Sequence, residues 1–103
     1  MSEQDDLKIA VNDLVIANRI LANEGVMDAS GHVSVRHPHD PNRYLMSQSR
    51  SPQLVDPADI LELTLDNQPV GGGSRPLYHE RFIHGAIYGL VSRANVLWDA
   101  SLI

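Results

Sequence analysis

The residues best suited to chemistry lie in one stretch, Pro76 to Leu90, which carries Glu80, His84 and Tyr88 at four-residue spacing. At about 100° per residue this stretch is predicted to form an amphipathic helix, with those three side chains in a polar row. The opposite, apolar arc consists of Phe82, Ile83, Ala86, Ile87 and Leu90. Glu80 falls at the border of the two faces, where partial desolvation would suit a carboxylate to proton transfer.

A purely structural interpretation of the same pair stays open. A glutamate in the first helical turn is favoured by the helix dipole, and a histidine can pack at the rim of a core. A further pair, His37 and His39, has the HxH spacing of metal ligands, which in a strand would put both imidazoles on one face. Pro38 and the following Asp40-Pro41-Asn42 indicate an exposed turn instead, with no third ligand nearby.

The elements that must position these residues can be read from periodicity. Apolar residues recur every three or four positions from Leu7 to Asn23, which predicts a first helix, and Gly25 follows as its C-terminal cap. In His32–Arg36 the alternation predicts a strand with Val33 and Val35 on one face and His32, Ser34 and Arg36 on the other. The remaining predicted elements are a hairpin partner at Tyr44–Ser47, a one-turn helix from Asp56 to Asp59, and strands at Ile60–Leu65 and Asn95–Trp98.

Composition narrows the class of protein. The chain has 103 residues, which predicts one small domain, and no cysteine, so a metal could be held only by His, Asp or Glu. The net charge of −5 and the lack of basic runs argue against nucleic acid and anionic membranes as partners. The start of the chain is acidic and no apolar stretch is long enough to span a bilayer, so a cytoplasmic protein is expected.

Four stretches, in order and evenly spaced, resemble the class II aldolase/adducin family from Asn18 to about Asn95. They are Ala29–Arg36, Leu45–Pro52, Asp59–Leu61 and Glu80–Tyr88. The resemblance implies an α/β fold, a layered α/β/α sandwich with a largely antiparallel central sheet. It covers about the first half of the family's domain, so residues 1–103 are expected to form a partial domain, incomplete at the C-terminal end. The family usually assembles as a homotetramer with its active sites between subunits.

The resemblance also implies residue roles. Glu80 matches the acid/base glutamate, while His84 and Tyr88 match structural positions. The family's phosphate-binding positions correspond here to Gly31 and His32, to Ser49 and Arg50, and to Tyr78 and His79. Because two serines are replaced by Tyr78 and His79, and Arg50 offers a bidentate fork, a flat carboxylate is expected in place of a sugar phosphate.

The family holds a divalent metal, usually zinc, through an HxH pair and a third, later histidine. Counting forward from Glu80, the HxH pair falls at Asp99 and Ser101, and no third histidine follows. We therefore predict no metal ligands in this chain, weak or absent zinc binding, and a truncated or frameshifted gene product.

Three functions remain open at this point. One is a metal-dependent lyase acting by aldol or decarboxylation chemistry on a small carboxylate or carbonyl substrate, and the others are a non-catalytic adducin-like domain and an inactive truncated product. The lyase makes two structural predictions. Glu80 should be half-buried, with the apolar arc packed on the sheet at Val33 and Val35, and His32, Ser49, Arg50 and His79 should converge near its carboxylate.

Overall fold

The computed structural model describes residues 2–25 and 31–99, and the side chains of that part up to Leu97. The chain opens with helix α1, Glu3–Asn23. It begins four residues before the predicted start, because the Ser2 side chain accepts a hydrogen bond from the Asp5 N–H at 3.1 Å and three acidic residues occupy the first turn. Gly25 follows with a φ of 73°, a left-handed conformation that ends the helix as predicted.

The centre of the molecule is a four-stranded antiparallel sheet with the order β3-β2-β1-β4. The strands are β1 at His32–Arg36, β2 at Arg43–Ser47, β3 at Ile60–Thr64 and β4 at Val96–Asp99. The hairpin of β1 and β2 and the strand β3 are therefore confirmed within one residue. The last strand is shifted by one residue from its predicted position. Val96 is 60% exposed, because β4 lies at an edge of the described sheet.

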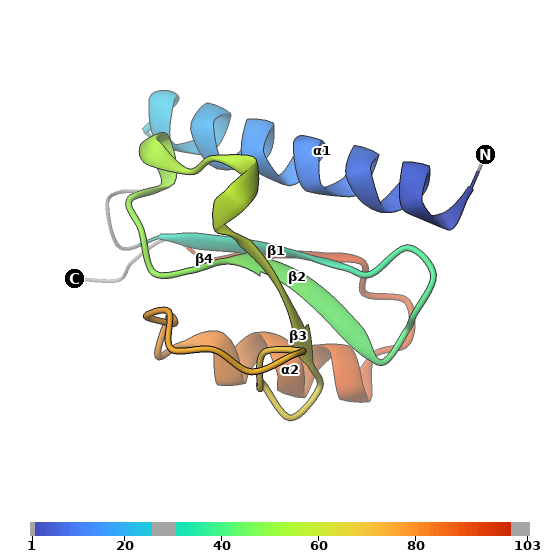
Figure 1. Cartoon of the computed structure of the whole chain (residues 1–103). Coiled ribbons are helices and arrows are strands. Elements are labelled where there is room, and N and C mark those ends of the chain that lie inside the picture. Colours follow the sequence, from blue (N-terminus) through green and yellow to red (C-terminus); the bar gives the residue numbers. More distant parts are fainter. Residues whose placement is uncertain (1, 26–30, 100–103) are drawn as a thin grey trace.

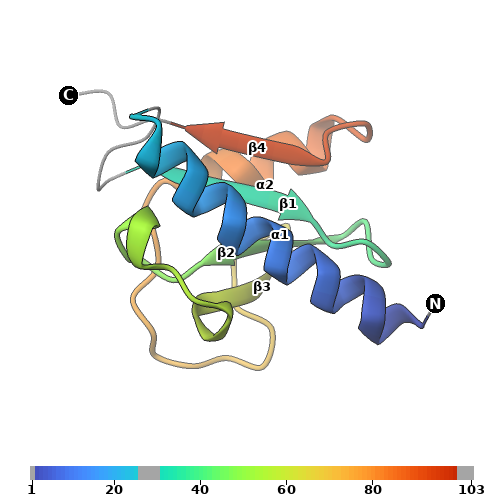
Figure 2. The ribbon, with the colours of Figure 1, turned by 90° about the horizontal axis from the view of Figure 1, so that it is seen from above.

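A helix covers each face of this sheet, as Figure 1 shows from the side and Figure 2 from above. Helix α1 packs on one face through Leu14, against Val33 and Leu45. The opposite face carries Tyr44, Met46 and Leu63, which cluster with Tyr78 and with Tyr88 of helix α2, Arg81–Leu90. The predicted α/β/α layering is thus confirmed.

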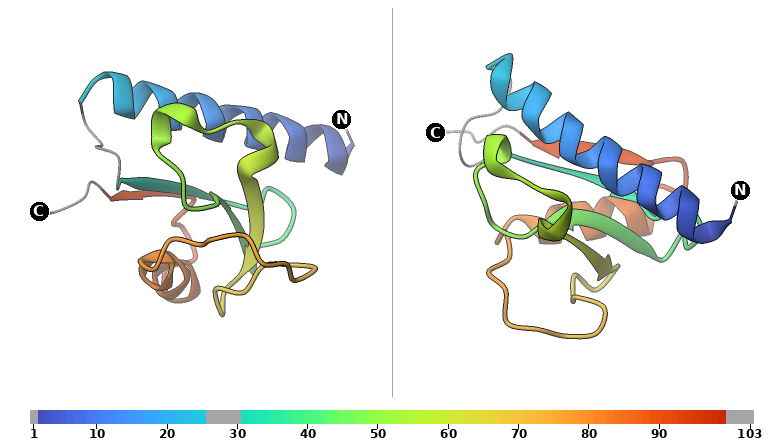
Figure 3. Two further views of the ribbon diagram at one scale, coloured as in Figure 1. Left: turned by 60° about the vertical axis from the view of Figure 1, so that its left-hand side comes forward. Right: turned by 45° about the horizontal axis from the view of Figure 1, so that its top comes forward.

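Two short 3-10 helices, η1 at Pro52–Leu54 and η2 at Pro57–Asp59, connect β2 to β3 on the α1 side of the sheet (Figure 3). The predicted one-turn helix is η2, while η1 was not predicted. Arg19 of α1 holds this connection, because its guanidinium donates to the Val55 carbonyl at 2.9 Å and to the Asp56 carboxylate at 2.7 Å. The loop that contains Arg50 is thereby fixed at its far end.

The buried face of α2 is the reverse of the predicted one. His84, Gly85 and Tyr88 are buried, whereas Phe82 is 47% and Ile83 50% exposed. The prediction that the apolar arc packs on Val33 and Val35 is therefore wrong, since those valines face α1. The physical reason is that His84 and Tyr88 find hydrogen-bond partners inside, so their burial carries little cost and their aromatic rings fill the core.

Both ends of α2 are held by arginines. Arg81 donates to the Asn67 carbonyl at 2.9 Å and to the Tyr78 carbonyl at 3.0 Å. Arg36 of β1 donates to the carbonyls of Tyr88 at 3.1 Å and Val91 at 2.9 Å, where a cation is favoured by the helix dipole. The helix is thus fixed in both rotation and position along the sheet. No helix among residues 2–25 and 31–99 is both long and apolar enough to cross a membrane.

Candidate functional site

Tyr78 joins the three chain segments that carry the predicted site residues. Its side chain is 7% exposed, and its hydroxyl donates to the Arg50 carbonyl and accepts from the Arg50 N–H at 3.3 Å. Its ring centroid lies 5.3 Å from that of His32. The Ser49 N–H donates to the Pro76 carbonyl at 2.8 Å, which ties the same loop to the same segment. The segments of residues 31–32, 49–50 and 78–80 therefore lie side by side.

The side chains of these segments take different directions. His32 is buried at 3% exposure. The Arg50 guanidinium pairs with Asp59 at 3.2 Å, while its side chain is 46% exposed. His79 is exposed and lies edge-on to Phe82, with ring centroids 6.1 Å apart. The structure brings the segments together, but Arg50 and His79 make their contacts with Asp59 and Phe82.

Glu80 is the residue that precedes α2, and it is exposed. The prediction that it is half-buried on the helix is wrong, because the helix begins at Arg81 and turns its other side to the sheet. Its side chain does not cap the helix either. The desolvation argument for proton transfer therefore fails in this structure, and the case for Glu80 rests on the resemblance and on its place two residues after Tyr78.

Asp59 anchors the Arg50 loop. Its buried carboxylate accepts from the Asp56 N–H at 2.9 Å, from Gln48 at 2.6 Å and from Arg50 at 3.2 Å. Burial alone would raise the pKa of the Asp59 carboxyl, but the Asp56, Gln48 and Arg50 donors together hold it below its usual value. Asp59 thus stays ionised and fixes one edge of the guanidinium.

Behind His32, four buried polar side chains form a continuous series, which we call the buried hydrogen-bond chain: Tyr88, Ser34, His84 and His32. The Tyr88 and Ser34 hydroxyl oxygens are 2.9 Å apart, and Ser34 Oγ is 2.5 Å from His84 Nδ1. His84 Nε2 is 2.7 Å from His32 Nδ1. Burial lowers the pKa of His84 to about 4, with the neighbouring His32 adding to the shift. His84 is therefore neutral at neutral pH.

By the resemblance His84 and Tyr88 match structural positions, and both side chains are buried. The contacts of Tyr78 with Arg50 and of Ser34 with His84 were not predicted. Tyr78 was noted only as a replacement for a serine, and its position between Pro76 and the helix gave no further signal. Ser34 was assigned to the same strand face as His32. This alternation was the one feature of the sequence to indicate that Ser34 and His32 could contact the same residue, which is His84.

The described residues do not offer a metal site. Among them, no three His, Cys, Asp or Glu side chains are grouped as a metal ion requires. His37 lies 3.2 Å from Glu62 and His39 lies 2.7 Å from Asp6, so this HxH pair engages two different carboxylates. The predicted HxH positions fall outside the described residues, since the Asp99 side chain and the whole of Ser101 are not described.

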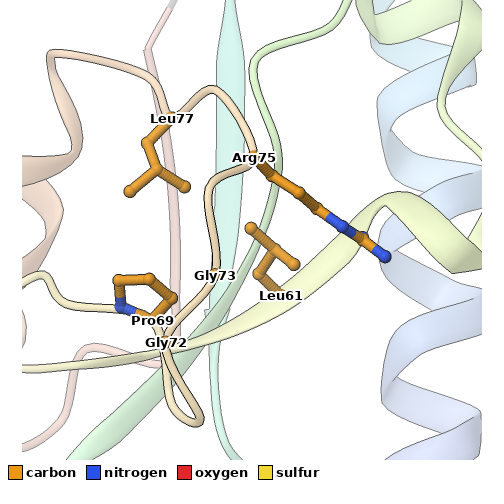
Figure 4. A pocket seen from close by; sticks show the side chains of 6 residues that line it. All are labelled: Leu61, Pro69, Gly72, Gly73, Arg75 and Leu77. Carbon is orange, nitrogen blue, oxygen red and sulfur yellow. The ribbon is translucent and has the colours of Figure 1, made fainter.

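A cavity of about 190 Å³ lies beside β3, away from these residues. Figure 4 shows Leu61, Pro69 and Leu77 around it, with the Arg75 side chain extending past its edge. The Arg75 guanidinium donates to the Ala58 carbonyl at 2.6 Å. None of the candidate site residues lines this cavity.

Comparison with known proteins places the fold in a family. The family model described as "Class II Aldolase and Adducin N-terminal domain" matches residues 12–97. The chain is 38% identical over 82 residues to a protein of Talaromyces stipitatus named decarboxylase tropJ, which covers 78% of this chain and 31% of that protein. This chain therefore belongs to the class II aldolase and adducin family.

Solved structures agree on the fold. An L-fuculose 1-phosphate aldolase from Glaciozyma antarctica superimposes with a TM-score of 0.84 at 23% identity, covering 96% of this chain and 42% of that one. An aldolase II superfamily protein from Pseudomonas syringae gives 0.74 at 19% identity, covering 84% and 36%. The chain thus spans less than half the length of these relatives.

Proposed function

We propose that this chain forms the substrate-binding and proton-transfer part of a lyase site of the class II aldolase type. The reaction is the cleavage of a C–C bond next to a carboxylate or carbonyl group, by aldol or decarboxylation chemistry. The observation that carries the proposal is the meeting of residues 31–32, 49–50 and 78–80 around Tyr78. Family membership and the identity to a protein named a decarboxylase support the reaction class.

In this proposal the three segments bind the substrate and transfer a proton to it. The Arg50 guanidinium pairs with the substrate carboxylate, with Gly31, His32, Ser49 and His79 as further contacts. When the C–C bond breaks, the electron pair stays on the carbon next to the carbonyl or carboxylate, and that carbon must then gain a proton. Glu80 transfers that proton, and its exposed position leaves room for a substrate.

The divalent metal of the family, zinc by the resemblance, does not fit the described donor set. A metal centre for this reaction would need ligands from outside the described residues, and we assign no step to it. We also propose that the exposed apolar side of α2, with Phe82, Ile83 and Leu90, supports the family's assembly into homo-oligomers in the cytoplasm.

A second candidate is a non-catalytic adducin-like domain. The exposed Glu80 and the lack of a three-ligand group among the described residues favour it. Both candidates share the fold, so only a chemical measurement separates them.

The test is proton exchange. Pyruvate, which carries a carboxylate beside a carbonyl, is incubated with the chain in D₂O with and without Zn²⁺, and loss of its methyl proton signal is followed by NMR. The proposal expects exchange faster than in buffer, and a drop of roughly 10²-fold in Glu80→Gln. Glu3→Gln is the matched control on an exposed helix start. Exchange at the buffer rate would refute the lyase and support the non-catalytic domain.

A further inference from the structure

Asp59 holds the Arg50 guanidinium through only one of its terminal nitrogens. Nη1 of Arg50 lies 3.2 Å from Oδ1 and 3.5 Å from Oδ2 of Asp59. Nε and Nη2 have no hydrogen-bond partner among the described residues, and the Arg50 side chain is 46% exposed. The N–H groups of Nε and Nη2 point the same way along one side of the guanidinium, at the spacing that matches two carboxylate oxygens. The contact with Asp59 therefore leaves a complete bidentate fork open to a ligand.

Both members of this ion pair are fixed by the fold. Asp59 is 4% exposed, and its carboxylate accepts from Nε2 of Gln48 at 2.6 Å and from the backbone N–H of Asp56 at 2.9 Å. The backbone of Arg50 is held by the Tyr78 hydroxyl, which contacts both its N–H and its carbonyl. The guanidinium is thus restrained at its backbone and at Nη1, so little side-chain freedom is lost when a ligand binds the open fork.

The charge of Asp59 gives this fork a preference that an arginine alone lacks. A guanidinium binds carboxylates and phosphates alike in a bidentate manner. Arg50 is the one arginine or lysine in residues 31–32, 49–50 and 78–80, and Asp59 balances its charge. The attraction of an anion to this pair grows in proportion to the charge of the anion, whereas the cost of removing the anion from water grows with the square of its charge. A weakened attraction therefore disfavours a dianion more than a monoanion.

We infer that Asp59 is a positioning residue that determines substrate specificity, because it keeps the Nε and Nη2 side of Arg50 open and selects planar monoanions over phosphate dianions. This inference rests on the proposed function, in which Arg50 pairs with the substrate carboxylate. It narrows the substrate class to compounds that present a single carboxylate to Arg50 and carry no phosphate group at that position.

Two probes that share a phenyl ring test the preference in the unmodified chain. Benzoate carries a planar monoanion, and phenyl phosphate is a dianion at about pH 8, since the second pKa of a phosphate monoester is about 6. Calorimetric titration at that pH measures both affinities. The inference expects tighter binding of benzoate, and tighter binding of phenyl phosphate would overturn it.

Asp59→Asn removes the charge and keeps an oxygen acceptor for the neighbouring donors. The affinity for phenyl phosphate should rise about tenfold and that for benzoate about threefold, the effect of one charge several ångström away in a water-like medium. If Asp59 had only a structural role, a loosened Arg50 would bind both probes more weakly. A ratio of benzoate affinity to phenyl phosphate affinity that stays the same or rises would therefore contradict the inference.

Arg50→Lys is a second variant, at an exposed position, that decides the matter if Asp59→Asn does not fold. Lysine keeps the positive charge but lacks the planar fork, so benzoate affinity should fall about tenfold and phenyl phosphate affinity by clearly less. Arg75→Lys is the matched control, because Arg75 is also exposed and donates to the Ala58 carbonyl at 2.6 Å, and it should change neither affinity. Equal losses of both affinities in Arg50→Lys would overturn the inference.

The outcomes separate this inference from the proposed function. If neither probe binds the unmodified chain, the proposed substrate site fails, and the role of Asp59 fails with it. If benzoate binds but the preference between the probes does not depend on Asp59 and the Arg50 fork, only the inference fails. The proposed function would then still be judged by the proton-exchange experiment.

Discussion

Nε2 of His84 lies 2.7 Å from Nδ1 of His32, although 52 positions separate the two residues in sequence. The contact joins α2 to the first residue of β1 in the interior between helix and sheet. It has two consequences: it turns a polar helix face into a buried one, and it places a histidine where a proton is poorly tolerated.

The first prediction concerns stability against pH. The pKa of His84 is lowered from 6.5 to about 4 in the folded chain, so between these values the unfolded state binds more protons. Stability should fall as pH falls from about 6.5 to 4, by on the order of 3 kcal/mol from this group. Urea unfolding at a series of pH values measures it, with His84→Gln as the comparison. A pH dependence that is the same in both proteins would contradict the burial of a neutral His84.

The second prediction uses the two glycines of α2. A Cβ on Gly85 would lie 2.0 Å from Asn67 Oδ1 and 2.8 Å from the Leu65 carbonyl oxygen, whereas a Cβ on Gly89 has nothing within 4 Å. Gly85→Ala should therefore destabilise the chain by about 1–3 kcal/mol through overpacking, against a helix-propensity gain of about 1 kcal/mol. Gly89→Ala should stabilise it by roughly 0.5–1 kcal/mol. Chemical denaturation measures the free energy of unfolding of both variants. Equal changes in Gly85→Ala and Gly89→Ala would mean that α2 does not pack against residues 65–67.

The third prediction tests which face of α2 is buried. Ile83 is 50% exposed and Leu63 is 1% exposed. At protein concentrations where the chain is monomeric, Ile83→Gln should change the free energy of unfolding by less than about 1 kcal/mol, while Leu63→Ala should cost about 2–5 kcal/mol. If Ile83→Gln lowered the free energy of unfolding as much as Leu63→Ala, the apolar arc of α2 would be shown to lie in the core.

The sequence predicts the positions of the helices and strands well, but it predicts the wrong buried face for α2. The difference depends on whether the deciding contacts are between residues close together in the sequence. Alternation in His32–Arg36 depends only on neighbouring residues, so the strand and its two faces could be predicted. The burial of His84 depends on Ser34 and His32, more than 45 positions away, and no local pattern shows such partners. The apolar arc was assigned to the core because hydrophobic residues usually are, and Phe82 and Ile83 are exceptions.

The same distinction between local patterns and long-range contacts applies to the candidate site. The resemblance placed the segments of Gly31, Arg50 and Glu80 in one region, and the structure brings those segments together through Tyr78. The direction of each side chain could not be predicted, because Asp59 holds Arg50 and Phe82 lies against His79. Both contacts depend on tertiary packing.

The fourth prediction concerns zinc. Four of the five described histidines have polar partners: His32 lies beside His84, and His37 and His39 lie beside separate carboxylates. The fifth, His79, lies against Phe82, and no described histidine belongs to a three-ligand group. Calorimetric titration with Zn²⁺ should therefore show weak or no binding, and only a small change in the double variant His37→Asn with His39→Asn. Tight one-to-one binding that survives in the double variant would show ligands beyond the described residues.

The central claim is that residues 31–32, 49–50 and 78–80 form one binding site for a carboxylate, and its most direct measurement is an amide NMR titration of the labelled chain with benzoate. The account predicts that shifted amides concentrate in these three segments, and that Arg50→Gln removes the shifts. Arg93→Gln, at an exposed arginine before β4 and at the other end of the sheet from His32, should leave them in place. Shifts scattered over the surface, or equal loss in both variants, would contradict the claim.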